Sequence, residues 1–199
     1  QGRYPEALQY PDTAAKALIV DLRGNEGGLD CGHLILERFL SADSALPMRR
    51  LVRFQRTPEH LDRFLDTGDP TLRQLGAKAR RFDGRFFALP GTDATLQPRG
   101  ARLLLPLLVL VDAGNSAAAF SFAQRVKASR AGTLVGQTTG GNLRGLNGGA
   151  FFFVRLPASG LEFDLPLIGT FPLQPAPDAG VEPDVKADVT AADIPAGRD

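Results

Sequence analysis

Twice in this chain a short apolar run ends at or beside an aspartate and leads directly into a turn of small residues and a helical pattern. Residues 17–22 lead into the glycine cluster 23–28, and the apolar spacing after Asp30 predicts a helix of about three turns. Residues 107–112 lead into a turn and a helix expected over 117–129. Uninterrupted apolar runs are typical of strands buried on both faces of a parallel sheet. We therefore expect an α/β fold of βα units around a mostly parallel sheet.

The other segments are less regular. Residues 41–100 contain five prolines and are expected to form an irregular helical cover over the core. A third strand is expected at 133–136, followed by the glycine-rich loop 137–149, which is too long to be a simple connection. Residues 150–156 and 161–165 predict a β-hairpin near the C-terminus. We expect the chain, residues 1–199, to be a single core domain.

Composition and charge exclude several classes of function. The chain has 23 Lys and Arg against 22 Asp and Glu, so its net charge of +1 argues against nucleic acid as a partner. Residues 49–85 hold ten basic and five acidic residues, a bias that we interpret as a solvated face. Cys31, His33 and His60 form no known ligand set, and the glycine spacing matches no phosphate-binding loop. No metal and no cofactor is therefore expected.

The two small-residue turns share a design suited to binding anions. Each turn connects the end of a strand to a helix, whose first N–H groups have no partner inside the helix. Glycines let backbone amides approach a ligand closely, and the second turn adds the hydroxyl of Ser116. Side by side, the turns would supply an oxyanion hole and a nucleophile. Alternatively, the glycines are ordinary turn residues and Ser116 is a helix N-cap.

Four blocks of the sequence, taken together and in this order, resemble peptidase family S41, the tail-specific or C-terminal processing proteases and their tricorn-core relatives. These blocks are the strand-plus-glycine segment 18–28, the nucleophile segment 108–123, the T-x-V-G-x-x-T-x-G segment 133–141 and the G-x-x-P-D segment beginning at Gly180. The resemblance implies a spiral core similar to crotonase and ClpP, a polypeptide substrate and no cofactor. It also implies acyl transfer through an activated serine, in a periplasmic or secreted protein.

The resemblance places the nucleophile at a residue that has no hydroxyl. In the family pattern the serine stands six residues before the alanine matched by Ala123 and nineteen before the glycine matched by Gly136. Both counts end on Ala117, not on Ser116. The chain is a serine-to-alanine variant made to trap an inactive state, or a natural pseudoenzyme, or it uses Ser116 after a shift of one residue. We favour the first interpretation because the other blocks are intact.

The remaining site residues are also implied by the resemblance. As oxyanion donors we expect the amides of Gly27 or Gly28 together with the amide of Ala118. The residues expected to border the substrate are Gly140, Gly141, Asn142 and Arg144.

The general base is the part of the family pattern that this chain lacks. Relatives with a Ser-Lys dyad carry lysine where this chain has Asn142, and the Ser-His-Glu branch carries its histidine upstream of the first strand. Residues 1–16 contain no histidine, so we expect the base in a segment that precedes this chain. His33 and His60 are weaker substitutes, since each is explained as a surface or packing residue.

The sequence thus predicts a serine endopeptidase, with two alternatives. One is a non-catalytic pseudopeptidase that only binds extended polypeptides and in which Ala117 is native. The other is an acyl-CoA enzyme of the crotonase type, which shares the paired oxyanion turns but is disfavoured by the glycine blocks. The sequence does not indicate an oligomeric state.

Overall fold

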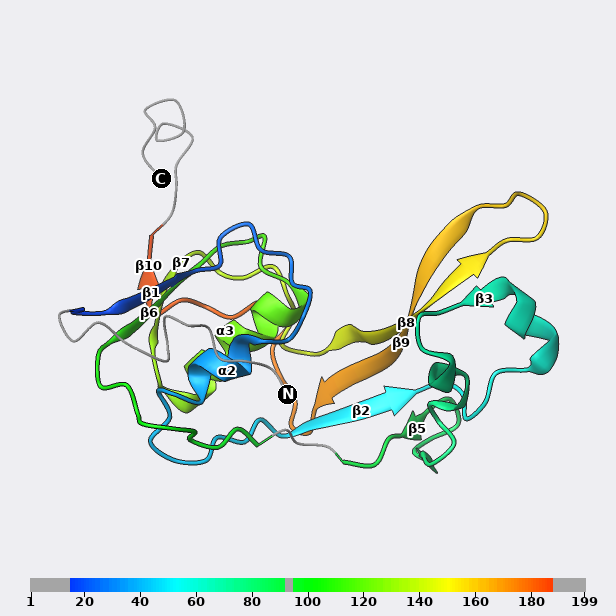
Figure 1. Cartoon of the computed structure of the whole chain (residues 1–199), viewed down its shortest axis with the longest axis horizontal. Coiled ribbons are helices and arrows are strands. Elements are labelled where there is room, and N and C mark those ends of the chain that lie inside the picture. Colours follow the sequence, from blue (N-terminus) through cyan, green and yellow to red (C-terminus); the bar gives the residue numbers. More distant parts are fainter. Residues whose placement is uncertain (1–14, 92–94, 188–199) are drawn as a thin grey trace. The chain divides into compact units, whose positions relative to one another are not determined.

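The computed structural model describes residues 15–91 and 95–187, and these fall into two compact units (Figure 1). The first unit takes the described residues up to Leu46, those from 95 to Asn142, and those from Asp178 onwards. The second unit takes the rest, which is the segment from Pro47 to 91 and the segment Leu143–Pro177. Each unit has its own sheet and is described by itself. That residues 1–199 form one domain stays a prediction.

The first unit is built on a four-stranded sheet in the order β1-β6-β7-β10. Its strands are β1 (Leu18–Asp21), β6 (Leu107–Val111), β7 (Thr133–Gly136) and β10 (Val185–Lys186). Every pairing between neighbours is parallel, so the α/β class and the parallel sheet are confirmed. Successive parallel strands must be joined by crossovers, which the βα pattern of the sequence provides.

Burial differs between the two strands that were expected to be buried on both faces. In β6, Leu107, Val109 and Val111 are buried and the residues between them are partly buried. The prediction is wrong for β1, where burial alternates and Ile19 is 60% exposed. β1 is the outer strand of the described sheet, so one of its faces lacks the cover that a central strand receives.

Two helices of the first unit pack on each other. α3 (Ala117–Ser129) has the predicted bounds and buries Phe120, Phe122 and Val126 on one face. α2 (Gly32–Leu36) touches α3 where Gly32 meets the ring of Phe122, since a Cβ on that glycine would lie 2.5 Å from a ring carbon. No helix in the described part of the chain is long and apolar enough to cross a bilayer.

α2 is shorter than the predicted three turns, and distant hydrogen bonds explain why. The carbonyl oxygen of Glu37 accepts from the amide of Arg99 at 3.0 Å, and that of Arg38 accepts from Leu103 at 2.7 Å. Both carbonyls would otherwise accept from the next helical turn. The α-helical pattern ends at Leu36 where the Arg38 amide donates to the carbonyl oxygen of Ile35, three residues back, and the two remote bonds prevent a further turn from following.

The second unit is built on a six-stranded antiparallel sheet in the order β3-β8-β9-β2-β5-β4. The strands in chain order are β2 (Met48–Val52), β3 (Leu65–Asp66), β4 (Arg80–Arg81), β5 (Phe87–Ala88), β8 (Leu146–Arg155) and β9 (Glu162–Pro172). β8 and β9 confirm the predicted hairpin and extend beyond it. Val52, Phe152, Leu167 and Ile168 lie in the core of this unit.

Residues 41–100 differ from the irregular helical segment that the prolines suggested. They contain two 3-10 helices, η1 (Glu59–Phe64) and η2 (Pro70–Gln74), and the four strands β2 to β5. These strands were not expected, because segments of two to five residues, several of them arginine, carry no clear alternation of apolar and polar side chains.

The segment after residue 177 belongs to the first unit, where the carboxylate of Asp184 holds it by hydrogen bonds. The Asp184 carboxylate accepts from Lys127 Nζ at 2.5 Å and from the Leu134 amide at 2.9 Å, and it precedes β10. Partial burial raises the pKa of Asp184, but the hydrogen bonds from Lys127 and Leu134 and the charge of Lys127 outweigh it, so the pKa lies below its usual range.

Because the folded state binds this proton more weakly than the unfolded state, the stabilisation from Asp184 is present at neutral pH and is lost as the pH falls below about 4. We expect the Asp184→Asn variant to lose less unfolding free energy than the unaltered chain between about pH 5 and pH 2. Urea titrations across this range measure the effect. Glu182→Gln, at an exposed neighbouring carboxyl, is the control and should leave the acid dependence unchanged.

Candidate functional site

Three loops leave the same edge of the parallel sheet. β1, β6 and β7 run in one direction, and their register places Asp21 opposite Leu110 and Val111 opposite Gly136. The loops that follow the carboxyl ends of these strands therefore begin side by side, which is where ligands bind in open α/β sheets. These loops carry the first three sequence blocks.

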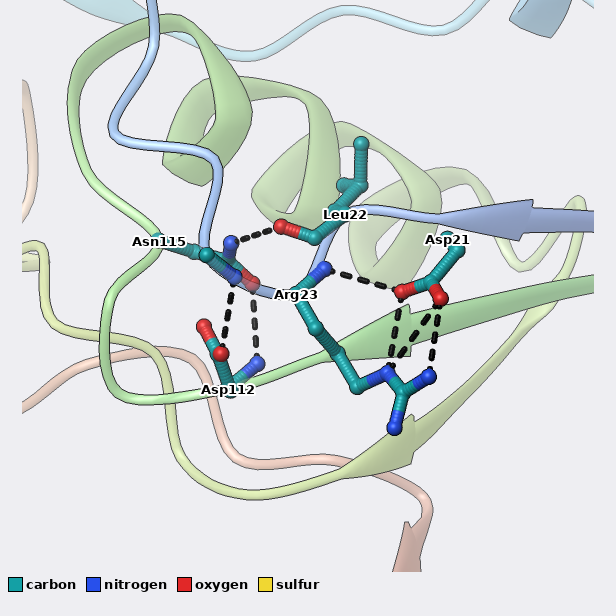
Figure 2. Close-up of polar contacts among 6 residues, drawn as sticks. Asp21, Leu22, Arg23, Asp112 and Asn115 are labelled. Atoms are coloured by element: carbon teal, nitrogen blue, oxygen red, sulfur yellow. Dashed lines mark hydrogen bonds and ion pairs between the residues drawn. The ribbon is translucent and has the colours of Figure 1, made fainter. Parts of the chain in front are cut away.

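Asn115 joins the first two loops from a fully buried position (Figure 2). Its Nδ2 donates to the carbonyl oxygen of Leu22 at 2.5 Å and to that of Asn25 at 3.2 Å. Its Oδ1 accepts from the backbone amide of Asp112 at 2.9 Å. One amide side chain thus satisfies three backbone groups and fixes the glycine cluster against the start of α3.

Two aspartates secure the same loops. The Asp112 carboxylate accepts from the amide of Gly24 at 2.8 Å and from that of Gly114 at 3.0 Å. Arg23 Nη2 forms an ion pair with Asp21 Oδ2 at 2.9 Å (Figure 2). The hydrogen bonds from the Arg23 side chain and amide hold the pKa of Asp21 below its usual range. Both Asp21 and Arg23 are exposed, so this pair shapes the loop without closing the site.

Ser116 is also used in joining the loops. Its Oγ donates to the carbonyl oxygen of Glu26 at 2.7 Å, and its side chain does not cap α3. The N-cap role that the sequence suggested as an alternative is therefore absent in the structure, although Ser116 does occupy the N-cap position. The Ser116 hydroxyl instead bonds to the loop that follows β1.

Ala117 adopts a backbone conformation that is uncommon for alanine. It is exposed, it begins α3, and its φ of +44° lies in the left-handed region. Such a conformation costs on the order of 1 kcal/mol for a residue with a Cβ, so the surrounding hydrogen bonds must maintain it. Strain of this kind is concentrated at functional sites.

Gly27 faces the start of α3, and Gly28 follows it in the same loop. A Cβ on Gly27, whose φ is +113°, would lie 2.7 Å from the Ala117 Cβ and 2.9 Å from the Ala118 nitrogen, so only glycine fits there. The Gly27 amide donates to Asn25 Oδ1 at 2.8 Å, which leaves it unavailable to a ligand in this conformation. Within the described ranges no group accepts from the amides of Gly28 and Ala118. These two amides are the donors the site offers.

The loop after β7 packs against the backbone of the loop after β6. The Gly141 amide donates to the carbonyl oxygen of Asn115 at 3.0 Å, and a Cβ on Gly140 would lie 2.1 Å from the carbonyl oxygen of Ala113. Asn142 Nδ2 donates to Asp178 Oδ1 at 2.6 Å. Gly140 and Gly141 are therefore brought to the second turn. Arg144 is an exposed residue of the second unit.

The fourth block closes on the third. The Val181 amide donates to Thr139 Oγ1 at 2.8 Å, and the Thr139 amide donates back to the Val181 carbonyl oxygen at 3.1 Å. A Cβ on Gly180 would lie 1.9 Å from the carbonyl oxygen of Thr139, which explains the glycine that opens the block. This block therefore supports the loop that packs under Asn115.

The histidines and the cysteine lie in different places. His33 is half-buried in α2, Cys31 is exposed and free, and His60 is exposed in η1 of the second unit. Among the residues that the structure describes, no three of the His, Cys, Asp and Glu side chains are grouped so as to hold a metal ion.

Three side chains that bond to the backbone of the first two loops were not among the predicted site residues: Asn25, Asp112 and Asn115. Asn25 stands two residues before Gly27, a spacing at which an asparagine side chain commonly accepts from the backbone, so this bond was open to prediction. The bonds of Asn115 to Leu22 and Asn25 span 93 and 90 residues, and no local pattern encodes them.

Comparison with known proteins identifies the family. The family model of peptidase family S41 matches residues 5–164, and the chain belongs to this family. The suggested resemblance is thereby confirmed. No curated protein matches the sequence at a significant level.

Solved structures share the fold. Mature CPAF has a TM-score of 0.59 at 20% identity, and the match covers 92% of this chain and 41% of CPAF. The complex of CPAF with lactacystin has a TM-score of 0.56 at 20% identity, and the match covers 92% of this chain and 41% of CPAF. A Parabacteroides merdae protein, proposed to be a peptidase, has a TM-score of 0.52 at 22% identity. The match covers 92% of this chain and 49% of that protein. The chain thus spans less than half the length of each of these proteins.

Proposed function

We propose that this chain is the catalytic core of a serine-type peptidase in which Ala117 occupies the position of the nucleophile. The observation that carries the proposal is the left-handed conformation of the exposed Ala117 at φ +44°. The amide of its neighbour Ala118, and that of Gly28 in the loop that packs on α3 through Gly27, have no acceptor among the described residues. A serine at this position would attack the carbonyl of a polypeptide substrate, and the two amides would stabilise the oxyanion. The peptide C–N bond would break as a general base passes the serine proton to the leaving amine, and water would then hydrolyse the acyl ester to a carboxylic acid and restore the hydroxyl.

The hydrogen bond of Ser116 supports position 117 over position 116. A nucleophilic hydroxyl must give its proton to a base while it faces the substrate. The Ser116 hydroxyl instead donates to the Glu26 carbonyl oxygen, which cannot act as that base at neutral pH. We assign Ser116 the task of holding the oxyanion loop in place.

The loop around residues 140–142 would border the substrate, and a contact of Arg144 with a substrate carboxylate stays a prediction from the sequence. We assign no general base at Asn142, because an amide does not accept a proton near neutral pH and this one donates to Asp178. Losing one oxyanion donor typically lowers the rate about 100- to 1000-fold, so the geometry of Gly28 and Ala118 would dominate the chemistry.

The missing hydroxyl is itself the observation that favours a second candidate. If Ala117 is the native residue, the same loops form a pseudopeptidase that holds an extended polypeptide without cleaving it. The two candidates predict different results when a serine is introduced at position 117: the peptidase gains activity, and the pseudopeptidase does not.

Fluorophosphonate labelling of the Ala117→Ser variant, made in the full-length natural protein so that the general base is not lost, separates the candidates. We expect labelling at position 117, located by mass spectrometry, and cleavage of an unfolded protein that the unaltered chain leaves intact. Adding Ser116→Ala to this variant is the control and should leave labelling at position 117. A label on Ser116 in the unaltered chain would refute the assignment. A folded, full-length Ala117→Ser protein that neither labels nor cleaves would favour the pseudopeptidase.

A further inference from the structure

Positive charge is concentrated in one part of the second unit. Residues 49–85 hold ten of the 23 basic residues but only five of the 22 acidic ones, although the whole chain carries a net charge of +1. From the sequence alone we interpreted this bias as a solvated face. In the structure, three of these arginines lie over phenylalanine rings.

Three arginines stack on two phenylalanine rings. The guanidinium carbon of Arg49 lies 4.6 Å from the centre of the Phe82 ring. Those of Arg53 and Arg85 lie 5.1 Å and 5.7 Å from the centre of the Phe86 ring. We call these five residues the arginine array.

A tight turn between β4 and β5 holds the two rings of the array. The amide of Phe82 donates to the carbonyl oxygen of Phe86 at 3.0 Å. The Asp83 carboxylate accepts from the amides of Arg85 and Phe86 at 2.7 Å and 2.8 Å. The backbone that carries the two rings is therefore held by hydrogen bonds of its own turn.

The nearby carboxylates are used elsewhere. Asp83 caps its own turn, Asp69 accepts from the Thr71 amide, Asp66 accepts from the Thr67 amide, and Asp62 pairs with Arg73 at 3.5 Å. In the described ranges, 15–91 and 95–187, no carboxylate forms an ion pair with the three arginines of the array. The array therefore holds three cations that form no ion pair among the described residues, and the single carboxylate of its turn, Asp83, is bonded to backbone amides.

We propose that the arginine array binds an acidic segment of another polypeptide. A guanidinium stacked on a ring keeps its N–H edge free, and this edge matches a carboxylate in a bidentate geometry. β4, the outer strand of the described sheet on this side, is Arg80–Arg81, so an extended segment that pairs with this edge adds two further cations. The inference does not depend on the proposed peptidase function.

The stacking also argues against other polyanions. Nucleic-acid surfaces of this kind offer free aromatic faces on which bases stack, whereas guanidinium groups lie over the rings of Phe82 and Phe86. A membrane surface would need apolar side chains that enter the lipid, and here the rings are partly covered by cations.

Fluorescence anisotropy with a fluorescein-labelled peptide of ten glutamates tests the proposal. We expect saturable binding that weakens with salt, and no binding of a ten-residue peptide of glycine and glutamine. The triple variant Arg49→Gln, Arg53→Gln, Arg85→Gln should bind about tenfold more weakly, because each exposed charge contact contributes modestly. The matched control Lys16→Gln, Arg130→Gln, Lys186→Gln removes the same charge from the first unit and should change binding less than about twofold.

A lysine series separates geometry from charge. Replacing the three arginines by lysine keeps the charge but removes the flat stacking and the bidentate edge, so binding should fall severalfold. In the unaltered chain, the side-chain Nε–H signals of Arg49, Arg53 and Arg85 should shift in nuclear magnetic resonance spectra as the peptide is added. This readout needs no variant to fold.

Three results would overturn the proposal. The first is equal binding of the glutamate and the neutral peptide. The second is lysine or glutamine triple variants, with unchanged thermal midpoints, that bind like the unaltered chain. The third is tighter binding of a ten-nucleotide DNA strand, or of phosphatidylserine vesicles, than of the glutamate peptide, which would assign the array to a different partner.

Discussion

Replacing Asn115 by leucine is expected to lower the free energy of unfolding by about 3 kcal/mol or more, although the two side chains are similar in size. The Asn115 amide is fully buried and satisfies the carbonyl oxygens of Leu22 and Asn25 and the amide of Asp112. Leucine leaves the Asn25 carbonyl oxygen and the Asp112 amide without a partner, and it leaves the Leu22 carbonyl oxygen with only the Asn25 amide at 2.9 Å. Each buried unsatisfied group costs about 1–3 kcal/mol. Urea denaturation followed by circular dichroism measures the loss.

The control for this prediction is Asn147→Leu, at an exposed position of β8, where the expected change is within about 0.5 kcal/mol. A loss at position 115 no larger than that of the control would contradict the role of Asn115 in joining the loops.

Asn115→Asp shows whether the donated hydrogen bonds are what matters. A carboxylate placed there would face two carbonyl oxygens, whereas the protonated acid would still donate to Leu22. The folded state would then bind a proton more tightly than the unfolded state, so stability should fall as the pH rises. We expect this variant to come closest to the unaltered chain at or below about pH 4, where the unfolded carboxyl is protonated, and to lose stability as the pH rises above that value. A loss independent of pH would contradict this account.

Replacing Gly136 by alanine is expected to destabilise the first unit by about 3 kcal/mol or more and to lower the thermal midpoint by about 6 °C or more. Gly136 ends β7 at a φ of +130°, and a Cβ there would lie 2.0 Å from the carbonyl oxygen of Val111. The backbone of β6 must move to admit it, and β6 carries the loop that begins α3. Thermal unfolding by calorimetry measures the shift.

Gly84→Ala is the matched control for Gly136→Ala. Gly84 has open space around an added Cβ and no positive φ, so alanine should leave stability unchanged or slightly raised. If Gly136→Ala unfolds within about 1 °C of the unaltered chain, the close approach of β6 and β7 at this glycine is incorrect.

The parallel half of the fold was predictable because its signals are local. β6, β7 and α3 follow from apolar runs, glycine turns and a helical spacing that need no distant partner. β2 was not predictable, since Arg49 and Arg50 break its apolar pattern and its strand character depends on pairing with β9. The end of α2 is set in the same way by Arg99 and Leu103.

The candidate site was predictable in position but not in mechanism. The four blocks locate the loops, and counting from Gly136 locates Ala117. The bond from the Gly27 amide to Asn25 is local and was missed, whereas the sequence could not reveal that Ser116 donates to Glu26, 90 residues away in the chain. These two bonds narrow the proposed oxyanion donors to Gly28 and Ala118 and remove Ser116 as the proposed nucleophile.

The most direct test is a crystal structure of the Ala117→Ser chain with a peptide boronic acid, which bonds to a nucleophilic serine. The account predicts a bond from boron to the introduced hydroxyl, with one boronate oxygen about 2.7–3.1 Å from the nitrogens of both Gly28 and Ala118. Ser116 Oγ should still donate to the Glu26 carbonyl oxygen. A boronate bonded to Ser116, or one whose oxygens turn away from both amides, would contradict it.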